Sequence, residues 1–136
     1  MQPHEIPVRR KLLDQWLHKA EQDLLAANSL LENEPPLLYP SCFHSQQAAE
    51  KYLKALLTWR KVDFPKTHSI GTLLDLLTGV DATLAESLAE ATALNPYGVE
   101  VRYPSDLPEP DIDEAEAALA LAGKVREAVL RALPQT

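Results

Sequence analysis

Apolar residues recur at every third or fourth position along most of the chain, which is the spacing of helices with one apolar face. The pattern predicts five helices, at about residues 8–33, 41–61, 69–78, 82–94 and 111–133. No segment alternates apolar and polar residues as a half-buried strand does, and no internal repeat is present. Short connections between long amphipathic helices therefore predict an all-α fold, an antiparallel up-and-down bundle of four to five helices, in a single domain over residues 1–136.

Residues near the predicted boundaries have the chemistry of helix ends. Ser41 is placed to cap the second helix, and either Thr67 or Ser69 is placed to cap the third. Gly79 is expected to stop the third helix. The fourth helix is expected to break at residues 95–98, which contain a proline and a glycine.

The start of the last helix is marked by Asp111 and, three residues later, Glu114, the spacing of a capping box. Before it lies an irregular segment, residues 99–110, with three prolines. A connection of this length is unusual in a small bundle, and such loops are commonly functional or disordered.

Charge is distributed unevenly along the 136 residues, whose formal net charge is −7. The first half, to residue 68, is close to neutral, whereas the second half is strongly acidic. Such a chain has no overall attraction for nucleic acid, so any nucleotide site must be a local basic pocket. The single cysteine, Cys42, excludes an internal disulfide and a Cys-rich zinc site. No apolar run is long enough to cross a membrane and no signal peptide is present, so we expect a cytoplasmic protein.

The second predicted helix has an unusually rich polar face. His44, Gln47, Lys51 and Lys54 are spaced three and four residues apart and therefore share one side of the helix. This side is either an ordinary solvated surface, a groove that meets phosphate or base edges, or a polar dimer interface. The opposite side is expected to pack in the core, with Phe43, Ala49, Leu53 and Leu56. Cys42 is expected to be a small core residue.

Two further groups are candidates for anion binding. Lys66 and His68 precede the third helix, where the helix N-terminus could hold an anion, although a histidine here is more often a structural hydrogen-bonding residue. Arg102 and Tyr103 lie in the long loop, where Pro104 biases Tyr103 to an extended backbone.

Arg102 suits two roles equally well. It either binds phosphate or pairs with Glu50 or Asp23 and fastens the loop to the bundle. Metal binding by His18, Glu21 and Asp23 is disfavoured, because His18 and Asp23 diverge around their helix. No metal or other cofactor is implied.

Several of these segments, in this order, resemble the HEPN family. The resemblance rests on Trp16 with AEQDL at 20–24, CFHSQQAAEKYLKALL at 42–57, FPKTHSI at 64–70, Tyr97, and RYP at 102–104. It implies a stand-alone bacterial or archaeal HEPN domain, an antiparallel helical bundle that is usually a homodimer. It further implies a possible nucleotidyltransferase partner, as in toxin–antitoxin pairs, and possible nucleotide or RNA binding.

Many HEPN domains are metal-independent ribonucleases with a histidine four to six residues beyond an arginine, and this sequence departs from that pattern. Arg102 has no histidine within reach, and Arg60 precedes His68 by eight positions. RNA cleavage without metal needs a base and a cation together. The sequence therefore predicts a non-catalytic domain that dimerises and binds nucleotide, RNA or a partner nucleotidyltransferase. The alternatives are a divergent ribonuclease using Arg102 with His44 or His68, and a scaffold whose acidic half docks a basic partner.

Overall fold

The computed structural model describes residues 5–99 and 108–134, and these residues are almost entirely helical. The elements in chain order are α1 (Glu5–Glu32), α2 (Leu38–Trp59), α3 (Ile70–Thr78), α4 (Ala82–Ser87), the 3₁₀ helix η1 (Ala89–Tyr97) and α5 (Ile112–Ala132). The predicted all-α bundle is confirmed. Within the part of the chain that is described, no helix is both long and apolar enough to cross a membrane.

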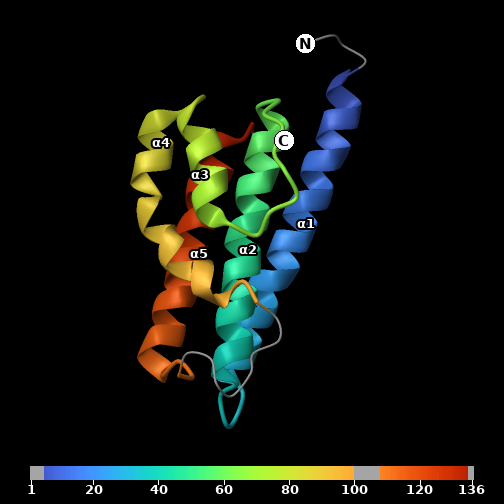
Figure 1. Ribbon diagram of the computed structural model, residues 1–136. Coiled ribbons are helices and arrows are strands. Elements are labelled where there is room, and N and C mark those ends of the chain that lie inside the picture. Colours follow the sequence, from blue (N-terminus) through green and yellow to red (C-terminus); the bar gives the residue numbers. More distant parts are fainter. Residues whose placement is uncertain (1–4, 100–107, 135–136) are drawn as a thin grey trace.

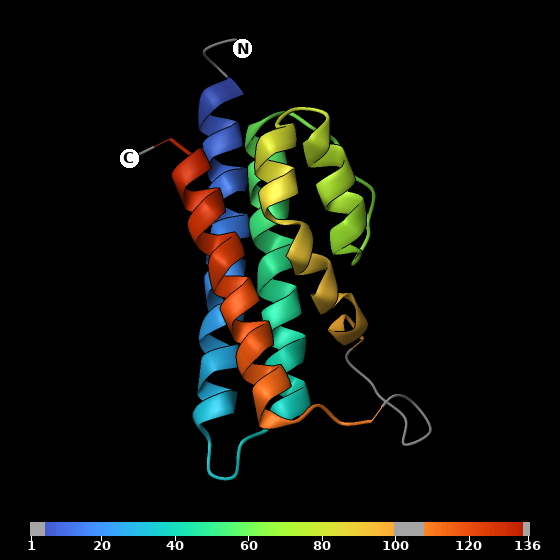
Figure 2. The ribbon, with the colours of Figure 1, turned by 90° about the vertical axis from the view of Figure 1, so that its left-hand side faces the viewer.

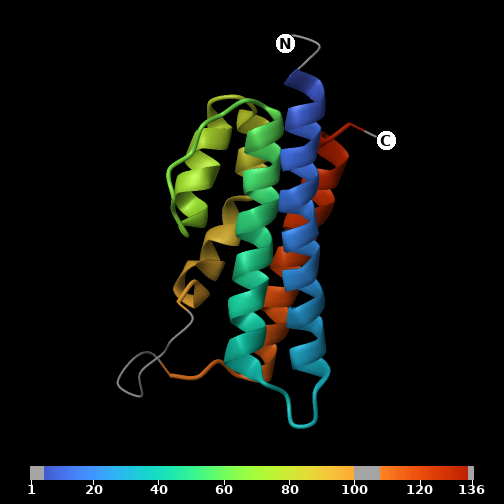
Figure 3. The ribbon, with the colours of Figure 1, turned by 90° about the vertical axis from the view of Figure 1, so that its right-hand side faces the viewer.

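α1 runs down the bundle in the view of Figure 1, whereas α2 and α5 both run up it. α1 and α2 form an antiparallel pair joined by a tight connection at one end, and α5 lies beside both of them (Figure 2). α4 and η1 run the opposite way to α5. The connection between α2 and α3 folds back along α2, so that α3 packs beside the upper half of α2 (Figure 3). This returning connection places residues 62–69 against the polar side of α2.

The core is built from aliphatic and small residues contributed by every helix. α2 is the central element and is buried over most of its length, with Ala49, Leu53 and Leu56 essentially inaccessible as predicted. Phe43 is only partly buried, and its ring meets the ring of His44 edge-on. Cys42 is a buried free cysteine, as expected. Because α2 is surrounded on most sides, polar residues on it must find partners inside the protein.

α2 begins earlier than predicted, and Ser41 does not cap it. The helix starts at Leu38, and the N-cap residue Leu37 makes no side-chain capping bond. Pro40 is tolerated because the first-turn N–H groups of a helix have no intrahelical partner. The Ser41 hydroxyl instead donates a 2.8 Å hydrogen bond to the carbonyl of Ala27, which ties α2 to α1.

α2 ends in a Schellman motif two residues before the predicted end. The N–H of Val62 donates to the carbonyl of Leu57, and the N–H of Lys61 donates to the carbonyl of Thr58. Lys61 occupies the left-handed position of this motif, with φ = 61°, where glycine is the usual residue.

The remaining boundaries follow the predictions with two differences. Ser69 caps α3, and Asp111 and Glu114 form the expected capping box of α5. The predicted fourth helix is divided into α4 and η1, and η1 continues through Pro96 instead of breaking before it. Gly79 does follow α3, but with an ordinary right-handed backbone, so it ends the helix without a left-handed turn.

Candidate functional site

A buried carboxylate is the centre of the polar side of α2. Glu50 is 2% exposed and accepts hydrogen bonds from Lys54 Nζ at 2.9 Å and from His68 Nδ1 at 3.0 Å. The amide of Gln46 is 3.4 Å from the same carboxylate and also donates to the main-chain carbonyl of His68 at 2.9 Å. Burying a carboxylate is costly unless it is paired and hydrogen-bonded, and these partners meet that requirement.

The hydrogen bond to Glu50 fixes the tautomer of the His68 ring. An ionised carboxylate only accepts hydrogen bonds, so Nδ1 of His68 carries a hydrogen atom and donates it in the bond to Glu50. In the neutral imidazole this leaves Nε2 as an acceptor. The His68 side chain is 72% exposed. The cluster therefore presents an oriented imidazole at the protein surface.

Lys54, in contrast, is withdrawn from solvent. Its side chain is 8% exposed, and its ammonium group lies 5.5 Å from the ring centroid of Trp16 and 5.8 Å from that of Phe64. The aromatic rings and Glu50 together replace the water that the ammonium group loses. Lys54 neutralises Glu50 from inside, while His68 approaches it from outside.

A second carboxylate, Asp23 on α1, gathers the other basic residues of α2. Asp23 is largely buried, and its two oxygens contact His44 Nδ1, at 2.9 Å, and Lys51 Nζ. Each of the two carboxylates therefore contacts the ammonium group of one lysine and the Nδ1 atom of one histidine. His44 and Lys51 both keep part of their side chains exposed.

The structure brings together five of the eight residues that the sequence indicated, in two neighbouring groups. Gln47 joins the Glu50 group, because its amide donates to the side-chain oxygen of Gln46 at 2.7 Å. Lys66 is exposed in the connection beside His68 and makes no hydrogen bond or ion pair to the described part of the chain. Arg102 and Tyr103 lie outside the described residues. The two carboxylates suggested as partners of Arg102 already have basic partners of their own.

Sequence reasoning missed the residues that hold the two groups together. Glu50 was considered only as a partner of Arg102, and Gln46 was given no role. Asp23 was considered as a partner of Arg102 and as a disfavoured metal ligand. The spacing of Gln46, Glu50 and Lys54, four residues apart, did indicate contact along one helix. Their burial was not visible in the sequence, because it depends on the connection at 62–69 folding back on α2.

A third polar group lies where α1, α2 and α5 meet. The buried Tyr52 donates its hydroxyl hydrogen bond to Glu21, which also accepts a 2.7 Å bond from Nε of Arg126. Burial and the neighbouring Glu21 raise the pKa of Tyr52 well above its usual range. The hydrogen bond to Glu21 also raises the pKa of Arg126. This group links three helices, and it occupies Glu21, one of the residues considered for metal binding.

These features define a small all-helical bundle domain with oriented basic residues along one helix. The HEPN domain family model matches residues 13–132. The chain belongs to the HEPN family, as its resemblance predicted.

Two solved structures are similar to the chain over most of its length. TT1696 from Thermus thermophilus is 34% identical, with a TM-score of 0.71, and the match covers 89% of this chain and 98% of that one. ST0689, described as an archaeal HEPN homologue, is 26% identical, with a TM-score of 0.66 and coverage of 88% and 96%. No curated protein matches the chain.

Proposed function

We propose that this HEPN domain is a non-catalytic binding module that dimerises and binds a nucleotide or RNA at the polar side of α2. The observation that supports the proposal best is the oriented imidazole of His68. A buried carboxylate, a buried lysine and a buried glutamine fix a histidine that is otherwise exposed. Such an arrangement costs desolvation energy and adds little stability at the surface. It does provide a preorganised hydrogen-bonding group for a ligand.

The proposed ligand contacts are divided between the two groups. Lys66 and His68 face solvent near the start of α3. Lys66 is suited to phosphate oxygens, and the acceptor Nε2 of His68 is suited to a ribose hydroxyl or a base N–H group. Lys51, His44 and Gln47 extend this surface along α2, and in the proposal Lys54 acts through Glu50 instead of touching the ligand. Arg102 and Tyr103 remain predicted ligand contacts.

Calorimetric titration of ATP, GTP and a short single-stranded RNA tests this function. We expect replacement of His68 by alanine to weaken binding about two- to tenfold, since a hydrogen bond contributes about 0.5–1.5 kcal/mol. Arg102→Ala should weaken binding similarly. His18→Ala is the matched control, because His18 is an exposed histidine on α1 outside this surface. Equal binding by all variants would exclude the site.

The proposed homodimer is tested separately, by light scattering of the purified protein at several concentrations. A dimer is the expected state, and a strict monomer would contradict this part of the proposal. Association with a nucleotidyltransferase is expected to be sensitive to salt if the acidic second half of the chain takes part in it.

One observation favours a second candidate function, a divergent ribonuclease. With Nδ1 committed to Glu50, the Nε2 atom of His68 is available to accept a proton from a ribose 2′-hydroxyl. Arg102 would supply the cation. Cleavage of a short RNA in the presence of a chelator, lost in both the His68→Ala and the Arg102→Ala variants, would establish this activity. Binding without cleavage would leave the binding module as the function.

A further inference from the structure

The two polar groups of α2 have the same composition and the same balance of charge. Each contains one largely buried carboxylate, one lysine and one histidine, and the carboxylate contacts both basic residues. The members are Glu50, Lys54 and His68 in one group, and Asp23, Lys51 and His44 in the other. While the imidazole rings are neutral, the charges of the lysine and the carboxylate are equal and opposite, so neither group carries a net charge.

This balance limits what the two lysines contribute to the binding of an anion. Lys54 is 8% exposed and lies between Glu50 and two aromatic rings, so its ammonium group is withdrawn from the surface. Lys51 is more exposed, but its ammonium group is in direct contact with Asp23. A phosphate that approaches Lys51 also approaches that carboxylate, and the two negative charges repel each other. Within these two groups, a net positive charge therefore has to come from the imidazole rings.

Both rings are placed so that a proton changes what they offer to a ligand. Nδ1 of His68 lies 3.0 Å from Glu50, and Nδ1 of His44 lies 2.9 Å from Asp23. Both rings are partly exposed, and neither Nε2 atom has a hydrogen-bond partner within the described part of the chain. A neutral ring in this orientation accepts at Nε2, whereas a protonated ring donates from both nitrogens. Histidine ordinarily changes between these two states between pH 5 and 8.

From these two arrangements we infer that the binding of phosphate groups at the polar side of α2 is coupled to proton uptake by His68 and His44. A protonated ring keeps its bond from Nδ1 to the carboxylate, gains an N–H group at Nε2 and gives its group one positive charge. A phosphate oxygen accepts a charge-assisted hydrogen bond from that N–H group. Because the anion binds the protonated rings better, its affinity rises as pH falls. The inference rests on the proposed function, since it requires the ligand to bind at this side of α2.

Few charged groups surround the His68 ring. It faces Glu50 with Lys54 behind that carboxylate, and Lys66 lies two positions earlier in the same connection. The first turn of α3 has no charged residue, and the acidic residue of η1, Glu90, is paired with a lysine of α5. Lys66 is exposed and keeps its charge throughout the range in which histidine titrates. It therefore contributes to affinity without contributing to its dependence on pH.

His44 has acidic residues on the two helices beside α2. Asp23 on α1 contacts the ring directly, and Lys19 lies one turn earlier in α1. The first turn of α5, at the end of the bundle where α2 begins, contributes Asp113 and Glu114 (Figure 1). These groups also keep their charges between pH 6 and 8. In this range, then, the titratable group of the Asp23 group is the His44 ring.

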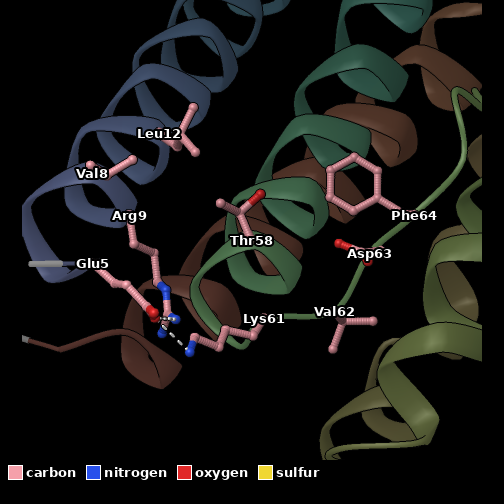
Figure 4. A pocket seen from close by; sticks show the side chains of 9 residues that line it. All are labelled: Glu5, Val8, Arg9, Leu12, Thr58, Lys61, Val62, Asp63 and Phe64. Carbon is pink, nitrogen blue, oxygen red and sulfur yellow. Dashed lines mark hydrogen bonds and ion pairs between the residues drawn. The ribbon is translucent and has the colours of Figure 1, made fainter. Parts of the chain in front are cut away.

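Another cluster of charges in the molecule contains no histidine and serves as an internal comparison. A groove of about 620 Å³, where α1 begins and α2 ends, is lined by two acidic and two basic residues, Glu5, Asp63, Arg9 and Lys61 (Figure 4). Glu5 contacts Lys61 at 2.9 Å and Arg9 at 4.0 Å. Because carboxylate, guanidinium and ammonium groups keep their charges between pH 6 and 8, this cluster offers an anion the same charge across that range.

Calorimetric titration of a hexauridylate without terminal phosphates tests the inference. Phosphodiesters and uracil do not change charge between pH 6 and 8, so any linked proton is taken up by the protein. Titrations at pH 7 in PIPES and in Bis-Tris, whose ionisation enthalpies differ, give the number of protons taken up for each RNA bound. We expect about 0.5–1.5 protons, since two ordinary histidines are mostly neutral at pH 7. The affinity should rise severalfold from pH 8 to pH 6.

Substitutions assign the protons to the two rings. His68→Gln keeps a hydrogen-bonding side chain without a titratable ring, so it should remove about half of the uptake, and the double variant with His44→Gln should remove the rest. His18→Gln is the matched control, because His18 is an exposed histidine on α1 outside both groups, and it should leave the uptake unchanged. Lys66→Gln should weaken binding by the same factor at pH 6 and pH 8. Circular dichroism verifies that each variant is folded.

Nitrogen-15 NMR gives a measurement on the unaltered protein. At pH 8 both rings should show the Nδ1–H tautomer, and addition of the RNA at pH 7 should convert them to doubly protonated rings. Binding without proton uptake, or uptake that persists in the double variant, would overturn the inference and leave the proposed function standing. Rings that stay neutral in the complex would do the same. Absence of binding at every pH would overturn the proposed function and the inference together.

Discussion

Glu50, buried in α2, accepts a hydrogen bond at 3.0 Å from Nδ1 of His68, a residue 18 positions later whose side chain is mostly exposed. The contact joins the interior of the bundle to its surface. Lys54 completes the charge balance from within, at 2.9 Å from the same carboxylate. The polar side of α2 is therefore neither an ordinary solvated face nor a fully open groove. It is a partly buried hydrogen-bond network in which a few side chains, such as that of His68, remain exposed.

Replacement of Glu50 by glutamine should destabilise the protein strongly. The substitution leaves the buried ammonium group of Lys54 without its counter-charge, and removing one partner of a buried ion pair costs about 3–5 kcal/mol. Urea unfolding followed by circular dichroism measures the change. Glu86→Gln is the control, since Glu86 is exposed on α4, and it should change stability by less than about 0.5 kcal/mol.

A double substitution separates the charge effect from loss of packing. Lys54→Met in the Glu50→Gln background removes the orphaned cation and keeps the long side chain against Trp16. The double variant should be more stable than Glu50→Gln alone, as coupled partners are not additive. If the loss of stability in the double variant equals the sum of the losses in the two single variants, Glu50 and Lys54 are not energetically coupled.

Tyr52 should make stability fall at alkaline pH. Burial and Glu21 raise its pKa in the folded state, so above about pH 10 the unfolded chain ionises Tyr52 while the folded protein still holds the proton. This contribution is complete below pH 10 and is lost progressively as pH rises. Tyr52→Phe should lower stability by about 1 kcal/mol at pH 7, because it removes one hydrogen bond to Glu21.

The stabilities of the wild type and of Tyr52→Phe should therefore converge as pH rises from 9 to 11. Urea unfolding at a series of pH values gives both curves, and absorbance at 295 nm follows tyrosine ionisation directly. A constant difference between the two proteins across this range would mean that Tyr52 does not titrate differently in the folded and unfolded states.

Two glycines should respond oppositely to alanine. Gly123 lies inside α5, and a β-carbon there would meet no atom within 4 Å. Gly123→Ala should raise stability by about 1 kcal/mol, the difference in helix propensity. A β-carbon at Gly98 would instead lie 3.3 Å from the amide of Gln46. Gly98→Ala should therefore disturb the hydrogen bond that Gln46 donates to the carbonyl of His68.

The same two variants connect the Glu50 network to the proposed binding function. Gly98→Ala should weaken nucleotide binding measured by calorimetry, whereas Gly123→Ala should leave it unchanged. Thermal unfolding supplies the stability comparison. If Gly98→Ala binds as tightly as the wild type, the orientation of His68 does not depend on Gln46.

The helices could be predicted from the sequence because apolar spacing and cap residues are patterns of residues close together in the chain. Apolar spacing located every long helix, and cap chemistry located the starts of α3 and α5 at Ser69 and Asp111. Two local predictions were wrong for local reasons. Pro40 is compatible with the first turn of α2, so Ser41 was not needed as a cap, and a 3₁₀ turn accommodates Pro96 within η1.

The sequence indicated only part of the candidate site, because the other contacts join residues that are far apart in the chain. His44 and Lys51 were on the predicted face, but Asp23, which holds them, comes from α1. A helical wheel of α2 cannot show whether α1 or solvent faces that side. The contact between Glu50 and His68 was invisible for the same reason, since His68 belongs to the connection that follows α2.

Lys61 offers a prediction about the energetic cost of its left-handed backbone conformation. Its backbone has φ = 61°, a conformation that costs a residue with a β-carbon about 1 kcal/mol relative to glycine. The ion pair of Lys61 with Glu5 is half exposed at both ends and contributes less than that. Lys61→Gly should therefore raise the free energy of unfolding, measured in urea, by about 0.5 kcal/mol or more. Arg60→Gly is the matched control, because Arg60 has φ = −84° and its replacement should lower stability. A Lys61→Gly variant that is no more stable than the wild type would mean that the lysine side chain contributes at least as much stability as its backbone conformation costs.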